Sequence, residues 1–267
     1  MAHHPIRDSF ISSTFVRHNH PAMFRTKQPI LRHNAVSTMT ATRLQILCWP
    51  ISMLLLLLIL PASGNLPPVS PSLTPELLAR HYRDNHDGFR AGVVFVCLSA
   101  IVYPFYGIGV GNVLSRAPGV NPVMIMAQTA AGVVVGMVFM TSGILFGAIT
   151  FRLDRDPVLI QLLSDLAWLF FTMMVPILTL QEVLIGWLIR SDRREKPMVP
   201  RWLAWANGIL PVGWFASWGS HCVQNGPFAW DGALTFWFTS ACYMLQLVVN
   251  VVFFWKAAGQ VDDEESE

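Results

Sequence analysis

Charged residues are scarce in this chain. Only 13% of its 267 residues are Asp, Glu, Lys or Arg, while 53% are hydrophobic and the mean hydropathy is +0.47. A soluble domain carries about 25% charged residues, so this composition argues against a soluble globular protein. The formal net charge of +2 is too small to indicate a nucleic-acid partner.

The sequence also lacks the motifs by which enzymes and metal sites are usually recognised. Its four cysteines, at positions 48, 97, 222 and 242, form no CxxC pair and no cluster with histidine, so neither a zinc site nor a disulfide framework is supported. HExxH and GxSxG are missing as well, although many hydrolases carry one of them. We therefore expect no metal, no cofactor and no catalytic residues.

The hydrophobic residues gather in long runs, each close to the length of a membrane span. A bilayer core about 30 Å thick needs roughly 20 apolar residues per helix, and lipid offers the backbone no hydrogen-bond partner, which favours helices. We predict an all-α, polytopic transmembrane bundle of six helices, or five if the first is a signal peptide cleaved near Ala62 or Gly64. The runs are 46–60, 91–114, 123–150, 158–189, 202–219 and 233–255.

The distribution of positive charge predicts the topology. The loop 190–201 contains five Lys or Arg residues, and the loop 220–231 contains none. Because cytoplasmic loops are enriched in Lys and Arg, the first loop is predicted to be cytoplasmic. With six helices, both termini are then cytoplasmic too.

Three regions are expected along the chain. Residues 1–38 are rich in Arg and poor in acids, as in a transit peptide or in an extension ahead of a true start at Met39, and we expect them to be disordered. Residues 39–257 form one transmembrane domain with an external segment at 65–90, Pro-rich and then helical from an N-cap at Thr74 to Gly88. Residues 258–267 are expected to be an acidic, disordered cytoplasmic tail.

The run 158–189 contains two carboxylates with no Lys or Arg between them. Steps of four and three residues place its polar side chains within an arc of about 100° on a helix, and Pro176 permits a kink. Because no Lys, Arg or His lies centrally in any run, each acid must carry a proton or face a water-filled cavity. The predicted polar stripe is Gln161, Asp165, Thr172, Thr179 and Glu182.

Neutral partners for the stripe are predicted on the last helix, where polar residues follow a similar spacing. Asn250 and Glu182 lie about equally far from the cytoplasmic end, so we predict a hydrogen bond between them. Near the outer end, His221 is the candidate partner of Asp165. The candidate partner residues are His221, Thr239, Tyr243, Gln246 and Asn250.

The third run carries two GxxxG units whose starts lie eleven residues apart, Gly132–Gly136 and Gly143–Gly147. This separation is close to three turns, so the glycines share a face. Small residues let helices approach closely, which predicts packing within the bundle, with a homodimer face as the alternative. The expected partners are the lipid bilayer and a second copy or another membrane protein.

Four segments resemble uncharacterised multi-pass membrane proteins of actinobacteria and some proteobacteria. They are RLQILCWP at 43–50, NLPPVSPSLTPELLARHYRDN at 65–85, LLSDLAW at 162–168 and GPFAWDG at 226–232. The resemblance extends over residues 43–256. It implies an uncleaved first helix, a start near Met39 and a place in the bacterial plasma (inner) membrane, and it transfers no functional residue.

Three functions remain open from the sequence. A non-enzymatic accessory or scaffold bundle, in which the stripe links helices, is favoured. A small proton-linked transporter would use Asp165 and Glu182 as titrating sites, although no internal repeat is present. An intramembrane enzyme would need a reactive set that is missing. A polar cavity that reached Asp165 from outside would favour transport.

Overall fold

The computed structural model describes residues 35–266, with side chains described for residues 41–259. This part of the protein is helical, and it contains no β-strand. Our interpretation of the N-terminal extension falls mainly on residues 1–34, which lie outside the described part. The question of a start at Met39 therefore stays a prediction.

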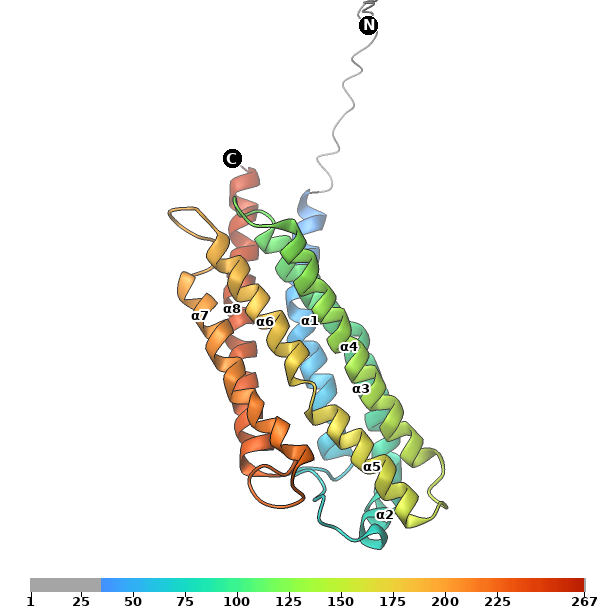
Figure 1. The fold of residues 1–267 in the computed structure, drawn as a ribbon. Helices are drawn as coiled ribbons and strands as arrows, with labels where there is room; N and C mark the ends of the chain where they lie inside the picture. The colour runs from blue at the N-terminus through green and yellow to red at the C-terminus, as the bar shows by residue number, and fades with distance from the viewer. Residues whose placement is uncertain (1–34, 267) are drawn as a thin grey trace, which may run out of the picture. The chain divides into compact units, whose positions relative to one another are not determined.

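The first four helices form one half of the bundle (Figure 1). α1 packs along α3, and α3 packs along α4, while the short α2 lies at the end where α1 joins α3. Pro at the first turn and a side-chain cap from Thr74, Asn121 or Asp156 start α2, α4 and α5, as expected of helix N-termini. The bounds are α1 Ala35–Ala62, α2 Pro75–Asp84, α3 His86–Leu114 and α4 Pro122–Phe151.

The second half begins with an interrupted helix. α5 ends at Thr172 and α6 begins at Val175, where the predicted run 158–189 was expected to be one kinked helix. Pro176 lies in the first turn of α6 and has no N–H to donate to Thr172, so the break falls just before it. The bounds are α5 Pro157–Thr172, α6 Val175–Ser191, α7 Arg201–Ile209, the 3-10 helix η1 Leu210–His221, the π-helical segment η2 Ala233–Phe238 and α8 Thr239–Ser266.

Successive passes alternate in direction within residues 35–266 (Figure 1). They are α1, α3, α4, the pair α5 and α6, the pair α7 and η1, and η2 with α8. The loops 115–121 and 192–200 lie at the same end as the start of α1 and the end of α8. We call this the basic end. α2 and the loops 152–156 and 222–232 lie at the other end.

Five segments of the described chain are long and apolar enough to cross a membrane. They are 41–62, 86–114, 122–151, 157–191 and 233–259. The predicted fifth run, 202–219, is helical too, but it is divided into a nine-residue α-helix and a twelve-residue 3-10 helix. Pro211 follows this change and cannot donate the α-helical bond, which favours the tighter winding.

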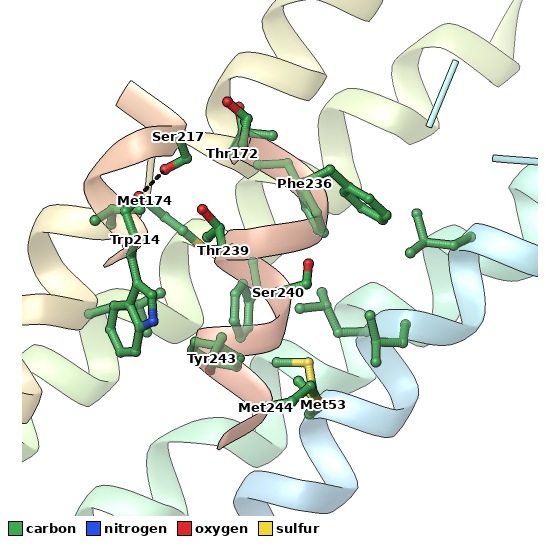
Figure 2. A pocket seen from close by; sticks show the side chains of 18 residues that line it. Met53, Thr172, Met174, Trp214, Ser217, Phe236, Thr239, Ser240, Tyr243 and Met244 are labelled. Atoms are coloured by element: carbon green, nitrogen blue, oxygen red, sulfur yellow. Dashed lines mark hydrogen bonds between the residues drawn. The ribbon is translucent and has the colours of Figure 1, made fainter. Parts of the chain in front are cut away.

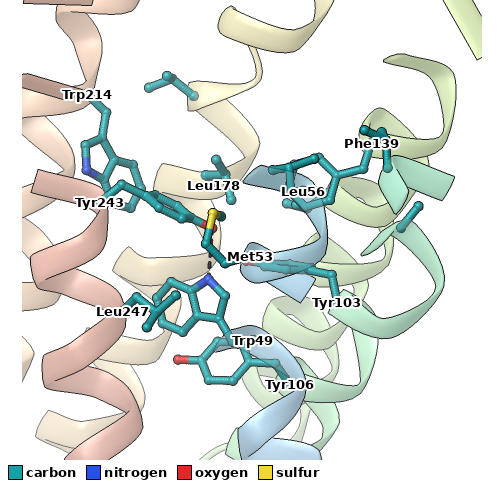
Figure 3. Packing of buried hydrophobic residues seen from close by; sticks show 14 of the residues in the cluster. Trp49, Met53, Leu56, Tyr103, Tyr106, Phe139, Leu178, Trp214, Tyr243 and Leu247 are labelled. Atoms are coloured by element: carbon teal, nitrogen blue, oxygen red, sulfur yellow. Dashed lines mark hydrogen bonds between the residues drawn. The ribbon is translucent and has the colours of Figure 1, made fainter. Parts of the chain in front are cut away.

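Aromatic side chains fill the centre of the bundle (Figure 3). The ring centroids of Trp49 and Tyr106 lie 4.5 Å apart, and Trp49 Nε1 donates to the Tyr243 hydroxyl at 2.9 Å. All three side chains are buried. These contacts tie α1 to α3 and α8.

Two boundaries differ from those expected. Gly88 does not end α2, which stops at Asp84; it lies in the first turn of α3, where a Cβ would collide with the carbonyl oxygen of Ala62. α8 continues to Ser266 instead of ending near residue 257. Ala257 and Ala258 are buried, so packing carries the helix beyond the predicted boundary.

Candidate functional site

Four polar side chains from three helices meet inside the bundle. Glu182 of α6, Asn207 of α7, and Gln246 and Asn250 of α8 are each at most 1% exposed, and we call them the polar cluster. Asn250 Nδ2 donates to Glu182 Oε2 at 2.8 Å, and Gln246 Nε2 donates to the same oxygen at 3.2 Å. The hydrogen bond predicted between Asn250 and Glu182 is therefore present.

Asn207 completes the cluster. Its Oδ1 accepts from Gln246 Nε2 and Asn250 Nδ2, both at 3.0 Å. Its Nδ2 donates to Asn250 Oδ1 at 3.0 Å and to the Leu203 carbonyl at 2.7 Å. α7 approaches α6 closely enough because Gly186 has no side chain, and a Cβ there would lie 2.8 Å from the Ala204 carbonyl oxygen.

Sequence reasoning missed Asn207. The residue is the single Asn in the apolar run 202–219, and a lone amide in a membrane span usually has a partner on a neighbouring helix. That signal was available. A search for spaced polar residues passes over it, because it belongs to no periodic set.

The cluster contains one acid and no base. Among the described residues, no Lys, Arg or His pairs with Glu182, and its Oε1 has no hydrogen-bond partner. The Gln246 Oε1 is likewise without a partner within residues 41–259. The side chains can thus hold three helices together, while one carboxyl oxygen is left over.

Gln181, next in sequence to Glu182, faces a different pair of helices. Tyr103 of α3 donates its hydroxyl to Gln181 Oε1 at 2.9 Å. The amide nitrogen lies against Gly107 and Gly132, where an added Cβ would come within 3.3 Å and 2.8 Å of it. Adjacent residues of a helix point about 100° apart, so this pair links α6 to α3 and α4 on one side and to α7 and α8 on the other.

The predicted stripe is not one continuous face. The break at 173–174 separates α5 from α6. The angle of about 100° between successive helical residues therefore cannot be counted across it. Thr172 donates to the Trp168 carbonyl at 2.9 Å and contacts the Ser220 hydroxyl at 3.3 Å. Gln161 reaches the Leu73 carbonyl at 3.4 Å, and the buried Thr179 hydroxyl has no partner in the described part.

Two predicted partner residues on the last pass bond elsewhere. Thr239 donates to the Leu234 carbonyl at 3.1 Å, within its own helical segment. Tyr243 accepts from Trp49 instead of contacting the stripe. Of the four candidates from this pass, Gln246 and Asn250 reach Glu182.

Asp165 does not meet His221. The Asp165 side chain is half-buried and makes no hydrogen bond or ion pair with any described residue. His221 is exposed, with Nδ1 2.5 Å from the Trp218 carbonyl and Nε2 3.3 Å from Cys222 Sγ. His221 belongs to the last turn of η1, and both of its ring nitrogens contact neighbours in its own segment. The expected pairing is therefore wrong.

A cavity of about 140 Å³ lies at the break between α5 and α6 (Figure 2). Its wall is mainly apolar and comes from α1, η1, η2 and α8 as well as from the break. Hydroxyl groups of Thr172, Thr239, Ser240 and Tyr243 are part of the lining, whereas Asp165 and Glu182 are not. An apolar cavity of about this size can hold one small ring.

All four GxxxG glycines face other helices of the same chain. A Cβ at Gly136 would lie 2.7 Å from the Ala100 carbonyl oxygen, one at Gly143 would lie 3.0 Å from Cys97 Sγ, and one at Gly147 would lie 3.5 Å from Val93. α3 thus covers most of this face, and Gln181 covers Gly132. Gly132, Gly136 and Gly143 are buried in these contacts and Gly147 is half-buried, so packing within the chain occupies most of this face.

Comparisons of the chain with protein-family models, with curated proteins and with solved structures find no match. The function is therefore inferred from the residues and their geometry.

Proposed function

We propose that this chain is an integral membrane protein that crosses the bilayer six times and acts as a non-enzymatic accessory or scaffold bundle. Five of the six passes have the length and composition of membrane spans. The pass made by α7 and η1 lies beside them and contributes Asn207 to the buried cluster. A pass that shares a buried polar network with two spans belongs at the same depth.

The charges at the two ends support cytoplasmic termini. Within residues 41–259, the basic end carries eight Lys or Arg residues and two acids, and the other end carries five and six. Lys and Arg are retained on the cytoplasmic side. We place the basic end in the cytoplasm of a bacterial cell, in line with the family that the four quoted segments resemble.

The observation that carries the scaffold function is the network of hydrogen bonds by which the polar cluster joins α6, α7 and α8. Every side-chain amide group of Asn207 and Asn250 donates within it, and all four members are buried. Interhelical hydrogen bonds in membrane proteins contribute about 0.6 kcal/mol each on average. A network of this kind fixes three helices in place, and it presents no reactive group to a substrate.

A proton-flux assay tests this function. The protein is reconstituted in liposomes that contain a pH-sensitive dye, and wild type is compared with Glu182→Gln, Asp165→Asn and protein-free vesicles. We expect all four samples to show the same proton leak. Flux through the wild type that disappears in Glu182→Gln, while the variant keeps its helical circular dichroism, overturns the scaffold proposal.

A proton-linked transporter is the second candidate. Two observations favour it: the Glu182 Oε1 that lacks a described partner, and the cavity at the helix break, whose lining includes Tyr243. Tyr243 lies three residues before Gln246, on the helix that supplies two members of the cluster. Transport predicts flux in the assay above, and loss of that flux in Glu182→Gln.

A further inference from the structure

The basic end contains a second pocket that is separate from the polar cluster. It lies where α6 ends and α7 begins, and its volume is about 680 Å³. Its lining combines three arginines, one acid and two tryptophans. They are Arg190, Asp192, Arg193, Arg201, Trp202 and Trp205.

The charge of the acid in this pocket is already balanced by an arginine. Asp192 is 5% exposed and forms an ion pair with Arg194, whose Nε lies 3.0 Å from Asp192 Oδ1. The Met198 N–H donates to Asp192 Oδ2 at 3.2 Å. Burial acts to raise the pKa of Asp192, but the hydrogen bonds from Arg194 and Met198 outweigh it and hold this pKa below its ordinary value.

The three arginines of the lining keep their charge available. Among the described residues, none of Arg190, Arg193 and Arg201 forms an ion pair with an acid. Arg201 is held by a hydrogen bond from Nη2 to the Arg194 carbonyl at 3.1 Å. The pocket therefore presents three positive charges at one end of the bundle, none of them paired with an acid of residues 41–259.

Tryptophans join this charge to an apolar surface. The guanidinium of Arg190 lies 5.0 Å from the ring centroid of Trp205, which places the outward faces of α6 and α7 side by side. Steps of three, four and three residues put one exposed apolar row on each pass. The rows are Leu180, Val183 and Trp187 on α6, and Trp202, Trp205, Ile209 and Val212 on α7 and η1.

We propose that this pocket binds the phosphate of an anionic phospholipid, whose acyl chains lie along the two apolar rows. Arginine suits phosphate because its planar fork can form two hydrogen bonds. Tryptophan is favoured at the level of the lipid headgroups. The apolar rows next to the arginines favour a lipid over a free anion, because a lipid's acyl chains can pack against them and a free anion cannot.

Native mass spectrometry of the purified protein tests the site, with phosphatidylglycerol and phosphatidylcholine as probes. The variant replaces Arg190, Arg193 and Arg201 by Ala. A matched control replaces Arg80, Arg90 and Arg152, three exposed arginines at the other end. It changes the net charge equally, and Arg152 also lies over an aromatic ring.

We expect the wild type to prefer phosphatidylglycerol. Each arginine at a lipid surface contributes about 1 kcal/mol, which is about 5-fold in affinity, so the triple variant should bind this lipid roughly 100-fold more weakly. The control should bind it as the wild type does. Trp205→Ala alone should weaken binding of both the headgroup and the chains.

Three results would overturn the proposal. The first is equal affinity for the two lipids, and the second is an equal loss in the control triple variant. The third is displacement of phosphatidylglycerol by millimolar inorganic phosphate, which would identify a site for a free anion. Circular dichroism and thermal melting of each variant verify that a loss of binding is not a loss of fold.

Discussion

The two acids of the segment 157–191 have opposite surroundings. Glu182 is buried, accepts two amide hydrogen bonds and links three helices. Asp165 is half-buried and makes no polar contact with the described side chains. One run of sequence therefore contains one acid that is buried and hydrogen-bonded and one that is partly exposed and unpaired among the described side chains. The difference comes from what neighbouring helices offer at each depth, not from the acids themselves.

The largest expected effect separates these two acids directly. Glu182→Ala removes the acceptor of Gln246 and Asn250 and leaves a cavity, so we expect a loss of about 2–4 kcal/mol in the free energy of unfolding. Asp165→Ala should cost less than about 0.5 kcal/mol, because the Asp165 side chain makes no hydrogen bond or ion pair with residues 41–259. Unfolding in mixed micelles measures both. Equal losses would break the contrast.

The contrast extends to the glycines of α4, which run from the half near the basic end to the half near the other end. Gly136→Ala places a Cβ 2.7 Å from the Ala100 carbonyl oxygen, and overpacking of this kind costs about 1–3 kcal/mol. Gly147→Ala finds its nearest atom, on Val93, at 3.5 Å and should be nearly neutral. Thermal melting of the two variants checks this. A more damaging Gly147→Ala would show that the half farther from the basic end is packed more tightly.

A third acid, Asp192, sharpens the comparison because one of its partners, Arg194, is charged. Asp192→Asn should cost about 1–2 kcal/mol, since hydrogen bonds to charged groups are stronger than neutral ones. The lowered pKa of Asp192 means that its contribution is present above the unfolded pKa of about 3.9 and is lost as the pH falls through the folded pKa.

The melting temperatures of wild type and Asp192→Asn should therefore converge as the pH falls below about 4. Melting curves between pH 7 and pH 3 measure this. A difference that stays constant down to pH 3 would contradict the assigned role of Asp192.

The smallest effect concerns the polar contact nearest to Asp165. The Tyr82 hydroxyl lies 2.8 Å from the Ser164 hydroxyl, and both residues are buried. Ser164→Ala should cost about 0.6 kcal/mol, the average for such bonds in membrane proteins. Tyr82→Phe is the reciprocal change, and the same unfolding assay should give a similar value for it. A loss as large as that of Glu182→Ala would remove the distinction between the two halves.

Local composition predicted the helices well. The runs 91–114 and 123–150 correspond to α3 and α4 within a few residues, because apolar length is a local property. The Glu182–Asn250 contact was also predictable, since depth along two spans can be counted from their ends. The place of Asn207 in the polar cluster was not predicted, because Asn207 has no periodic partner within its own run.

The half farther from the basic end was predicted less well, for a different reason. The pairing of Asp165 with His221 assumed that depth alone brings side chains together. Asp165 lies in α5 and makes no polar contact, and His221 lies in the last turn of the 3-10 helix η1, where it bonds to the Trp218 carbonyl. Tertiary packing decides such local changes in winding, and a single run of sequence does not record it.

The polar cluster also implies a delay during synthesis between Glu182 and its hydrogen-bond donors. Asn250 follows Glu182 by 68 residues, which a ribosome adds in about 3 to 14 s at bacterial and eukaryotic rates of about 5–20 residues per second. During that interval the carboxyl group of Glu182 must wait without its final hydrogen-bond donors. A chain that ends between Glu182 and Gln246 keeps the acid and lacks both of those donors. In such a chain, the carboxyl group of Glu182 is the unpaired polar group that membrane quality control would recognise.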